Sequence, residues 1–235
     1  QKERELIVEY GKKLITHGLT KGTGGNISIY NKEEGLMAIS PSGIDYFETK
    51  PENVAVLDLY GKQVDGDKKP SSEYFMHRVF YRDRDDVGAV VHAHSTYSGV
   101  LATLHWEIEP VHYLIGYAGK NVRCAPYELF GTEELAQAAL KAMEDRNACL
   151  LANHGLLAIG GTVEYAFDTA EYVDEAVCDA LDRNIKREDF IHADEYVFED
   201  GVFKGTRQYD MYLNHIYGDY MELPPENRRV SHHDF

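Results

Sequence analysis

The chain has 235 residues, of which 43% are hydrophobic and 27% charged, a composition typical of a soluble globular protein with a sizeable core. Its formal net charge of -16 disfavours nucleic acid or an anionic membrane as a partner. No apolar run approaches the length of a transmembrane helix, and no secretory signal pattern opens the chain. Cys124, Cys149 and Cys178 lack the spacing of a disulfide framework or a thiolate zinc site, so we expect a reduced, cytoplasmic protein.

The first part of the chain is predicted to contain one amphipathic helix and then several strands. Helical spacing of apolar residues predicts the helix over residues 2–17, and Gly18 marks its end. A glycine-rich segment, residues 22–25, leads into a strand. Its backbone N–H groups can form an anion-binding nest, although a plain turn would also account for the glycines. Further strands are expected at residues 36–39 and 54–59.

Two serines stand just before the next predicted helix, residues 74–81. Ser71 or Ser72 is the expected N-cap, with Glu73 in the first turn, where the helix dipole favours a carboxylate. Capping alone explains this pattern, but a helix N-terminus with two hydroxyls is also suited to bind a phosphate group. Glu73 would then lie close enough to act on the same ligand.

A short apolar run rich in β-branched residues, 86–91, predicts a buried strand that leads directly into two histidines. Successive side chains of a strand point to opposite faces, so His92 and His94 are expected on one face, with Ala93 turned away. Two imidazoles placed in this way can bind one metal ion. An isolated His-x-His is more often a pair of structural histidines, so the metal interpretation needs further ligands from elsewhere in the chain.

The second part of the chain is predicted to have helices at residues 95–104, 131–146 and 162–187, and two strands within residues 148–160. An Asn-His-Gly turn separates these two strands. His154, within this turn, is costly in an apolar core without a partner. As a third nitrogen ligand it would complete a three-histidine site with an open position, as in catalytic zinc sites. The order of elements predicts an α/β fold in which helices flank a mostly antiparallel central sheet.

Six motifs follow one another along the chain, at residues 22–28, 41–43, 70–73, 91–94, 112–113 and 153–155. Together they resemble the class II, zinc-dependent sugar-phosphate aldolase family, over roughly residues 3–187. The resemblance implies a nine-stranded, mostly antiparallel sheet flanked by helices. It also implies a homotetramer with active sites between neighbouring subunits. Residues 1–187 are expected to form the aldolase domain, and residues 188–235 a C-terminal tail of that same domain.

The resemblance also implies roles for single residues. His92, His94 and His154 would bind one Zn2+ ion per subunit, and Glu73 would approach the metal when no substrate is bound. Tyr113 would reach the reacting oxygen from the adjacent subunit. The implied phosphate-binding positions are Thr23, Asn26, Ser42, Gly43, Ser71 and Ser72.

The expected reaction is cleavage of a ketose 1-phosphate, with L-fuculose 1-phosphate as the first candidate, to dihydroxyacetone phosphate and L-lactaldehyde. The C3–C4 bond would break with Lewis-acid help from zinc and without a Schiff-base lysine. Glu73 would be the general acid/base that protonates the enediolate carbon, and Tyr113 would handle the proton of the aldehyde-side oxygen. Phe130 is interpreted as an apolar wall for a methyl-bearing aldehyde. Tyr209 is the first candidate for a tail tyrosine that closes over the site, with Tyr212 second.

Other activities within the family remain open from the sequence. Residues 153–157 favour an aldolase over L-ribulose-5-phosphate 4-epimerase, whose members usually carry Pro-Phe after the His-Gly pair. A methylthioribulose-1-phosphate dehydratase shares the zinc ligands and is a further alternative. The adducin head shares the fold without zinc catalysis, so the fold alone does not establish chemistry. The presence of all three histidines and Glu73 argues against such a non-catalytic binding module.

Overall fold

The structure is a computed structural model that describes residues 1–110, 112–182, 193–198 and 201–206. It divides into two compact units, Gln1–Asp179 and Ala180–Phe235. The described part of the second unit contains an antiparallel hairpin of β9 (Ala193–Phe198) and β10 (Gly201–Thr206). That residues 188–235 form a tail of the same domain remains a prediction.

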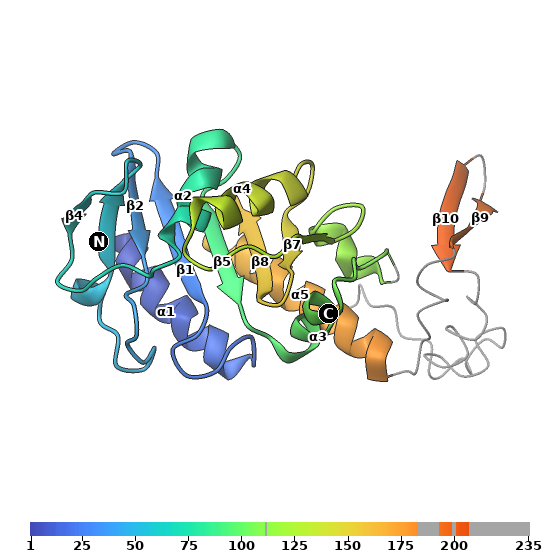
Figure 1. The fold of residues 1–235 in the computed structure, drawn as a ribbon, viewed down its shortest axis with the longest axis horizontal. Helices are drawn as coiled ribbons and strands as arrows, with labels where there is room; N and C mark the ends of the chain where they lie inside the picture. Colours follow the sequence, from blue (N-terminus) through green and yellow to red (C-terminus); the bar gives the residue numbers. More distant parts are fainter. Residues whose placement is uncertain (111, 183–192, 199–200, 207–235) are drawn as a thin grey trace, which may run out of the picture. The chain divides into compact units, whose positions relative to one another are not determined.

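An eight-stranded sheet is the central element of the first unit, with the strand order β4-β3-β2-β1-β5-β8-β7-β6 (Figure 1). Every neighbouring pair is antiparallel except β6 and β7, which are parallel. The predicted α/β fold with a mostly antiparallel sheet is therefore confirmed, with eight strands in this sheet of the described chain where the resemblance implied nine. The strands are β1 (Asn26–Asn31), β2 (Leu36–Ile39), β3 (Ala55–Asp58), β4 (Gln63–Asp65), β5 (Ala89–Ala93), β6 (Arg123–Ala125), β7 (Ala148–Leu151) and β8 (Gly155–Gly160).

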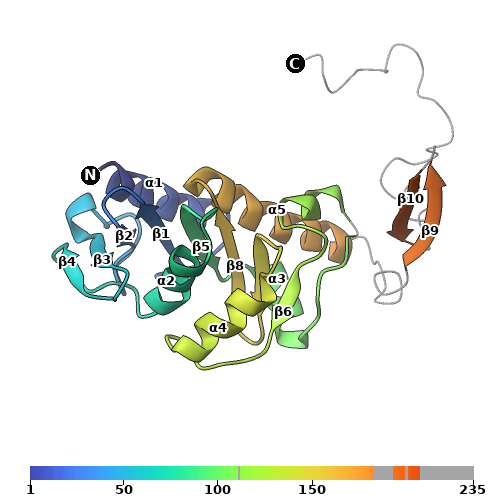
Figure 2. The same cartoon turned by 90° about the horizontal axis from the view of Figure 1, so that it is seen from above.

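Helices cover both faces of this sheet. Apolar side chains of α1, α3 and α5 form one core against the sheet, and those of α2 and α4 form a second core on the opposite face. Figure 2 shows α1 and α5 on one side of the strands, with α2 and α4 on the other. The helices are α1 (Lys2–Thr16), α2 (Tyr74–Asp83), α3 (Thr96–Leu104), α4 (Glu133–Ala142) and α5 (Val163–Asp182), with short 3-10 helices η1 (Pro51–Asn53) and η2 (Tyr113–Tyr117).

The apolar periodicity explains how the helices dock. On α1, Ile7, Tyr10 and Leu14 recur at helical spacing and are buried, and the Tyr10 ring meets Phe167 of α5 edge-on at 5.3 Å between ring centroids. The helix predicted over residues 2–17 is confirmed. In the described part of the chain, none of the helices is both long and apolar enough to span a bilayer.

Alternation along β5 decides which face receives each histidine. Val91 and Ala93 belong to the core beneath α1, α3 and α5, whereas Val90 belongs to the core beneath α2 and α4. His92 has the same parity as Val90 and therefore points toward the side of α2. This places the His92 side chain on the face of the sheet where α2 begins.

Candidate metal centre and active site

Four side chains converge where β5 ends and α2 begins. Glu73, His92, His94 and His154 each offer one ligand atom, and these four atoms lie within 4.8 Å of one another. The Nε2 atoms of His92 and His94 are 2.8 Å apart. The carboxylate of Glu73 lies 3.5 Å from His92 Nε2 and 3.3 Å from His154 Nε2. Residues far apart in the sequence thus form one compact donor set of three nitrogens and one oxygen.

Each ligand comes from the end of a regular element. His92 is the fourth residue of β5, and His94 directly follows that strand. Glu73 is the residue just before α2, and His154 closes the turn between β7 and β8, where its backbone N–H donates to Leu151 O at 3.0 Å. Such anchored ends hold side chains more firmly than an open loop would.

The turn before His154 is itself anchored. Asn153 adopts the left-handed conformation, with a φ of 56°. Its backbone N–H donates to Ala102 O at 3.0 Å, and its side-chain amide donates to His105 Nε2 at 2.9 Å. These two bonds tie the turn to the end of α3, so His105 supports the position of His154.

The chemistry of the donors fits a metal ion. Leu156 O can only accept a hydrogen bond, so the 2.9 Å contact with His92 fixes the proton on Nδ1 and leaves the lone pair of Nε2 facing the cluster. Burial, together with neighbouring His94 and His154, holds the pKa of His92 well below its usual range, so the ring is a neutral ligand at neutral pH. Glu73 Oε1 is buried and has no hydrogen-bond partner among the described residues.

Gly155 allows β8 to approach this cluster closely. A Cβ atom at this position would lie 2.4 Å from Ala93 O and 3.0 Å from His94 Cδ2. Only a residue without a side chain permits this packing. Gly155 thus keeps β8 close to the four ligand atoms, which together could hold a metal ion.

The predicted phosphate-binding residues lie on two neighbouring loops. Ser42 N–H donates to Lys69 O at 3.0 Å, and Ser71 N–H donates to Ser40 O at 3.0 Å, so the loop after β2 runs beside the segment before α2. Ser42, Gly43 and Ser72 are exposed there, whereas Ser71 is buried. Their role in binding phosphate remains a prediction, and the pairing of the loops shows how they would act together.

The N-cap of α2 differs from the sequence expectation. Glu73, rather than Ser71 or Ser72, occupies the N-cap position, and its side chain makes no capping hydrogen bond. The serines form a turn before the helix instead, in which Ser71 Oγ accepts a hydrogen bond from Glu73 N at 3.3 Å. The predicted serine N-cap was therefore wrong, because the helix begins one or two residues later than the serines. As a result, the Glu73 carboxylate is free to face the histidines.

The glycine-rich loop is held against the metal strand. Gly25 has a φ of 67°, and a Cβ atom there would lie 2.6 Å from His92 O, so glycine is required at this position. The buried hydroxyl of Tyr46 donates to Gly25 O at 2.8 Å. Sequence reasoning missed Tyr46, which the local pattern does not connect to the loop. Thr23 is exposed on the same loop.

Asn26 was predicted to bind phosphate, and the structure gives its side chain two protein partners. Its Nδ2 donates to Glu73 Oε2 at 2.9 Å, and its Oδ1 lies 2.5 Å from His77 Nε2. His77 was not identified from the sequence. Burial, aided by His92, lowers the pKa of the fully buried His77 to about 3, so its ring is neutral. The four-residue spacing of Glu73 and His77, one turn apart on α2, was the signal that could have found it.

The remaining predicted residues lie in exposed positions or outside the described chain. Tyr113 begins η2 and is 82% exposed, with its ring 4.8 Å from that of His112. Phe130 is 62% exposed, and at the next residue, Gly131, a Cβ atom would lie 2.9 Å from Ser72 O. The loop of Phe130 therefore borders the predicted phosphate site. Tyr209 lies outside the described residues.

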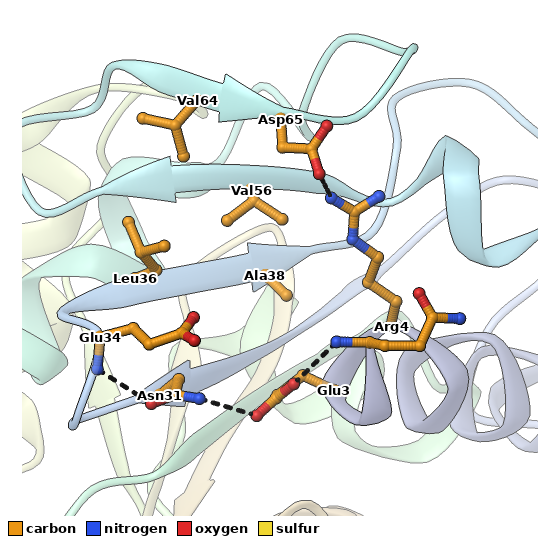
Figure 3. Close-up of a pocket in the computed structure, with 10 residues that line it drawn as sticks. Glu3, Arg4, Asn31, Glu34, Leu36, Ala38, Val56, Val64 and Asp65 are labelled. Atoms are coloured by element: carbon orange, nitrogen blue, oxygen red, sulfur yellow. Dashed lines mark hydrogen bonds and ion pairs between the residues drawn. The ribbon is translucent and has the colours of Figure 1, made fainter.

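A separate cavity of about 180 Å³ lies between the start of α1 and strands β2 to β4 (Figure 3). Leu36 and Val56 contribute to an apolar part of its lining, while Arg4 and Asp65 form an ion pair on its polar side. Arg4 also donates to Pro51 O at 3.5 Å, so its guanidinium group is already engaged. Glu73 and the three histidines do not line this cavity, which is distinct from the metal centre.

Comparison with known proteins shows which family the chain resembles. Residues 5–180 match the family described as Class II Aldolase and Adducin N-terminal domain. The chain is 59% identical to the 5-deoxy-D-ribulose 1-phosphate aldolase of Bacillus thuringiensis serovar kurstaki over 174 residues, which are 74% of this chain and 82% of that protein. It is 42% identical to the 5-methylthioribulose-1-phosphate/5-deoxyribulose-1-phosphate aldolase of Rhodospirillum rubrum over 73% of this chain and 77% of that protein. A solved structure of L-fuculose 1-phosphate aldolase superposes with a TM-score of 0.77 at 43% identity, covering 91% of this chain and 94% of that one.

Proposed function

Because this chain belongs to the class II aldolase and adducin N-terminal domain family, we propose that it is a metal-dependent aldolase that cleaves 5-deoxyribulose 1-phosphate. The products would be dihydroxyacetone phosphate and acetaldehyde, which together contain every atom of the substrate. The observation that carries the proposal is the convergence of Glu73 with His92, His94 and His154. A non-catalytic relative of this fold would have no need for a buried carboxylate beside three imidazoles.

The choice of sugar phosphate is supported by the relatives. The relative with 59% identity is named for 5-deoxy-D-ribulose 1-phosphate, and the one with 42% identity is named for 5-deoxyribulose 1-phosphate together with its methylthio analogue. L-Fuculose 1-phosphate, the first candidate from the sequence, becomes the second. The solved structure named for that substrate is 43% identical to this chain, compared with 59% for the relative named for 5-deoxy-D-ribulose 1-phosphate. Both substrates yield dihydroxyacetone phosphate, and they differ by one CHOH group in the aldehyde.

The residues of this chain have separate tasks in the proposed reaction. Zinc, held by the three histidines, would supply Lewis-acid stabilisation of the negative charge that develops on the substrate oxygens. One proton leaves the C4 hydroxyl, the C3–C4 bond breaks with its electron pair retained on the C3 side, and one proton is delivered to C3. Glu73 first takes a proton from solvent, then delivers it to C3 and returns to the carboxylate, a role for which its side chain is placed beside the metal ligands. Tyr113 of a neighbouring copy would move the proton of the aldehyde-side oxygen.

The two loops before α2 and after β2 would hold the phosphate group. Ser71 and Ser72 precede a helix N-terminus, where backbone N–H groups and the helix dipole favour an anion. Ser42 and Gly43 lie on the loop that pairs with this segment. Because the chain carries a net charge of -16, such local donors are needed to bind a dianion. Phe130 would border the aldehyde end of the substrate.

The test is release of dihydroxyacetone phosphate, followed by a coupled assay, from 5-deoxyribulose 1-phosphate and from L-fuculose 1-phosphate. We expect release from both, with the higher kcat/KM for 5-deoxyribulose 1-phosphate. A chelator should stop it and zinc should restore it. No release from either sugar by the zinc-loaded protein would overturn the proposed reaction. Release that favours L-fuculose 1-phosphate would keep the aldolase and reverse the order of substrates.

The same zinc-loaded protein also tests the two alternative activities, the epimerase and the dehydratase. An epimerase would convert L-ribulose 5-phosphate without releasing dihydroxyacetone phosphate, and a dehydratase would consume methylthioribulose 1-phosphate with loss of water.

We further propose a homotetramer in which Tyr113 completes a neighbouring site. Its exposed side chain suits such a reach, and light scattering tests the assembly. A cytoplasmic location and the closing role of Tyr209 also remain proposals.

A further inference from the structure

Polar side chains of β1 and of α2 with its N-cap pack against one another and form hydrogen bonds next to the metal centre. Glu73, His77 and Tyr81 follow one another at intervals of four residues along one side of α2 and its N-cap. Asn26 and Ser28 alternate along β1 on the face toward α2. All five are buried, with at most 7% of any residue exposed. A buried polar row of this length needs a partner for every group.

The hydrogen bonds of this row run in one direction. Asn26 Nδ2 donates to Glu73 Oε2 at 2.9 Å, so the amide oxygen of Asn26 faces the other way, toward His77 Nε2 at 2.5 Å. That oxygen can only accept, so Nε2 must carry the proton. The neutral ring then accepts at Nδ1 from Ser28 Oγ, 2.7 Å away. Ser28 Oγ in turn accepts from the Tyr81 hydroxyl at 2.6 Å.

The opposite orientation of the Asn26 amide is penalised at both ends. Turned over, the amide oxygen would face the Glu73 carboxylate, and two acceptors would repel each other. At the other end the amide NH2 group would face the N–H of His77, and two donors would meet. Each mismatch leaves buried polar groups without a hydrogen bond, which is costly in a low-dielectric interior. The Glu73 carboxylate at one end and the N–H of His77 at the other therefore favour the same orientation of Asn26.

We infer that His77 is a positioning residue for the reaction: through Asn26, it holds the Glu73 carboxylate in the orientation from which it transfers a proton at C3 of the substrate. This inference rests on the proposed function. In the described structure His77 hydrogen-bonds to Asn26 and Ser28, and to none of the predicted metal ligands or the predicted phosphate residues Ser42, Gly43, Ser71 and Ser72. Its effect is expected on proton transfer rather than on binding of the sugar phosphate.

Two amide substitutions at this position form a matched pair. In His77→Gln, the side-chain amide reaches the position of ring Nε2 and can still donate to Asn26 Oδ1. In His77→Asn, the shorter amide ends near the position of ring Nδ1 and leaves Asn26 Oδ1 without its donor. Both variants place an uncharged amide of similar polarity in the same buried space. Because Asn leaves the larger void, a purely structural role would also harm His77→Asn more than His77→Gln. Such a role would lower bound zinc and raise KM together with the loss of kcat, whereas a positioning role lowers kcat and leaves KM and bound zinc unchanged.

The experiment compares the zinc-loaded full chain and both variants by three readouts. These are kcat and KM for aldol cleavage, solvent deuterium exchange at C3 of dihydroxyacetone phosphate by proton NMR, and bound zinc with the melting temperature. In His77→Asn, kcat and the exchange rate should fall about 10- to 100-fold, the range for loss of a residue that orients a reacting group. KM and bound zinc should stay near the wild-type values. His77→Gln should recover most of both rates.

Adding Asn26→Leu to His77→Asn should lower kcat no further than Asn26→Leu alone, because the two residues act as one unit. A folded, zinc-loaded His77→Asn protein with wild-type kcat and exchange rate would overturn the inference, as would equal loss in His77→Gln and His77→Asn. If a variant does not fold, neutron diffraction from the wild-type protein decides. The inference is supported if deuterium is found on His77 Nε2 and if the deuterated amide nitrogen of Asn26, Nδ2, faces Glu73. The reverse arrangement overturns it.

Failure of the proposed function would have a different signature. If wild-type protein releases no dihydroxyacetone phosphate from any ketose 1-phosphate, the reaction is wrong whatever the variants do. If the wild type is active and the matched pair does not separate, only the role of His77 is wrong.

Discussion

Replacing Gly155 by alanine should weaken both the fold and the metal centre. The added Cβ would lie 2.4 Å from Ala93 O, about 1 Å inside the 3.4 Å at which ordinary contact begins. It would also lie 3.0 Å from His94 Cδ2 and 3.4 Å from His92 Cε1. The obstacle is a strand carbonyl that is held in the β5–β8 pairing and cannot swing aside. Relief therefore requires β8 to move away from the strand that carries two of the metal ligands.

The expected cost is about 1–3 kcal/mol, the range for inserting a methyl group into a closely packed interior. For a chain of this size each kcal/mol lowers the melting temperature by roughly 2–4 °C, so a fall of roughly 2–12 °C should be measured by calorimetry. Zinc affinity, measured by competition with a chromophoric chelator, should fall about 10- to 100-fold because both imidazoles shift.

Gly99→Ala is the matched control for Gly155→Ala. Gly99 lies inside α3, and its Cβ position has no described atom within 4 Å. Alanine there should raise stability by about 0.4–1 kcal/mol, because it restricts the unfolded chain and favours the helix. If Gly155→Ala melts and binds zinc like the wild type, the close approach of β8 to the metal strand is not a feature of the protein.

Three further predictions address the carboxylate, the buried histidine and the core. Glu73→Gln should lower kcat about 10²- to 10⁴-fold with zinc still bound, because it removes the acid/base group but keeps the three histidines; full activity in the coupled assay would remove Glu73 from the mechanism. Because the pKa of His77 lies near 3 in the fold, below about 6.5 when unfolded, its contribution to stability is complete above about pH 6.5 and is lost as the pH falls toward 3, at roughly 1.4 kcal/mol per pH unit. Urea titrations of zinc-free protein at several pH values should show a shallower dependence in His77→Gln, and an unchanged slope would contradict the neutral, buried state of the ring. Phe80→Ala should cost about 3–5 kcal/mol in urea unfolding because Phe80 is fully buried, whereas Tyr60→Ala, at a side chain 92% exposed, should stay within about 0.5 kcal/mol of the wild type.

Much of the fold could be read from local patterns. Apolar residues at helical spacing predicted the helices at residues 2–17 and 162–187, of which α1 and α5 are the observed counterparts within the described chain. The helix expected over residues 131–146 is shorter, because α4 ends at Ala142. Helix ends are weakly encoded, since the last turn depends on what packs against it. Strand alternation predicted that His92 and His94 share a face, and their Nε2 atoms lie 2.8 Å apart.

The sequence by itself was enough to name the four residues of the cluster, partly from local patterns and partly from the family resemblance. Alternation along β5 aims His92, and its proximity to His94 follows from a spacing of two residues. The polar turn between two apolar strands suggested His154, and the family resemblance added Glu73 as a residue that approaches the metal. The structure brings all four together.

Only the tertiary structure decided how that cluster is supported. Asn26 and Glu73 are 47 residues apart, and their hydrogen bond exists only because α2 lies across β1 in one register. Local patterns tell which face of a strand or helix is buried, but not at what offset two buried faces mesh. A shift of one residue along β1 would turn Asn26 away from α2 altogether. The chain of donors through His77 is therefore a product of packing, and it could not be read from either segment alone.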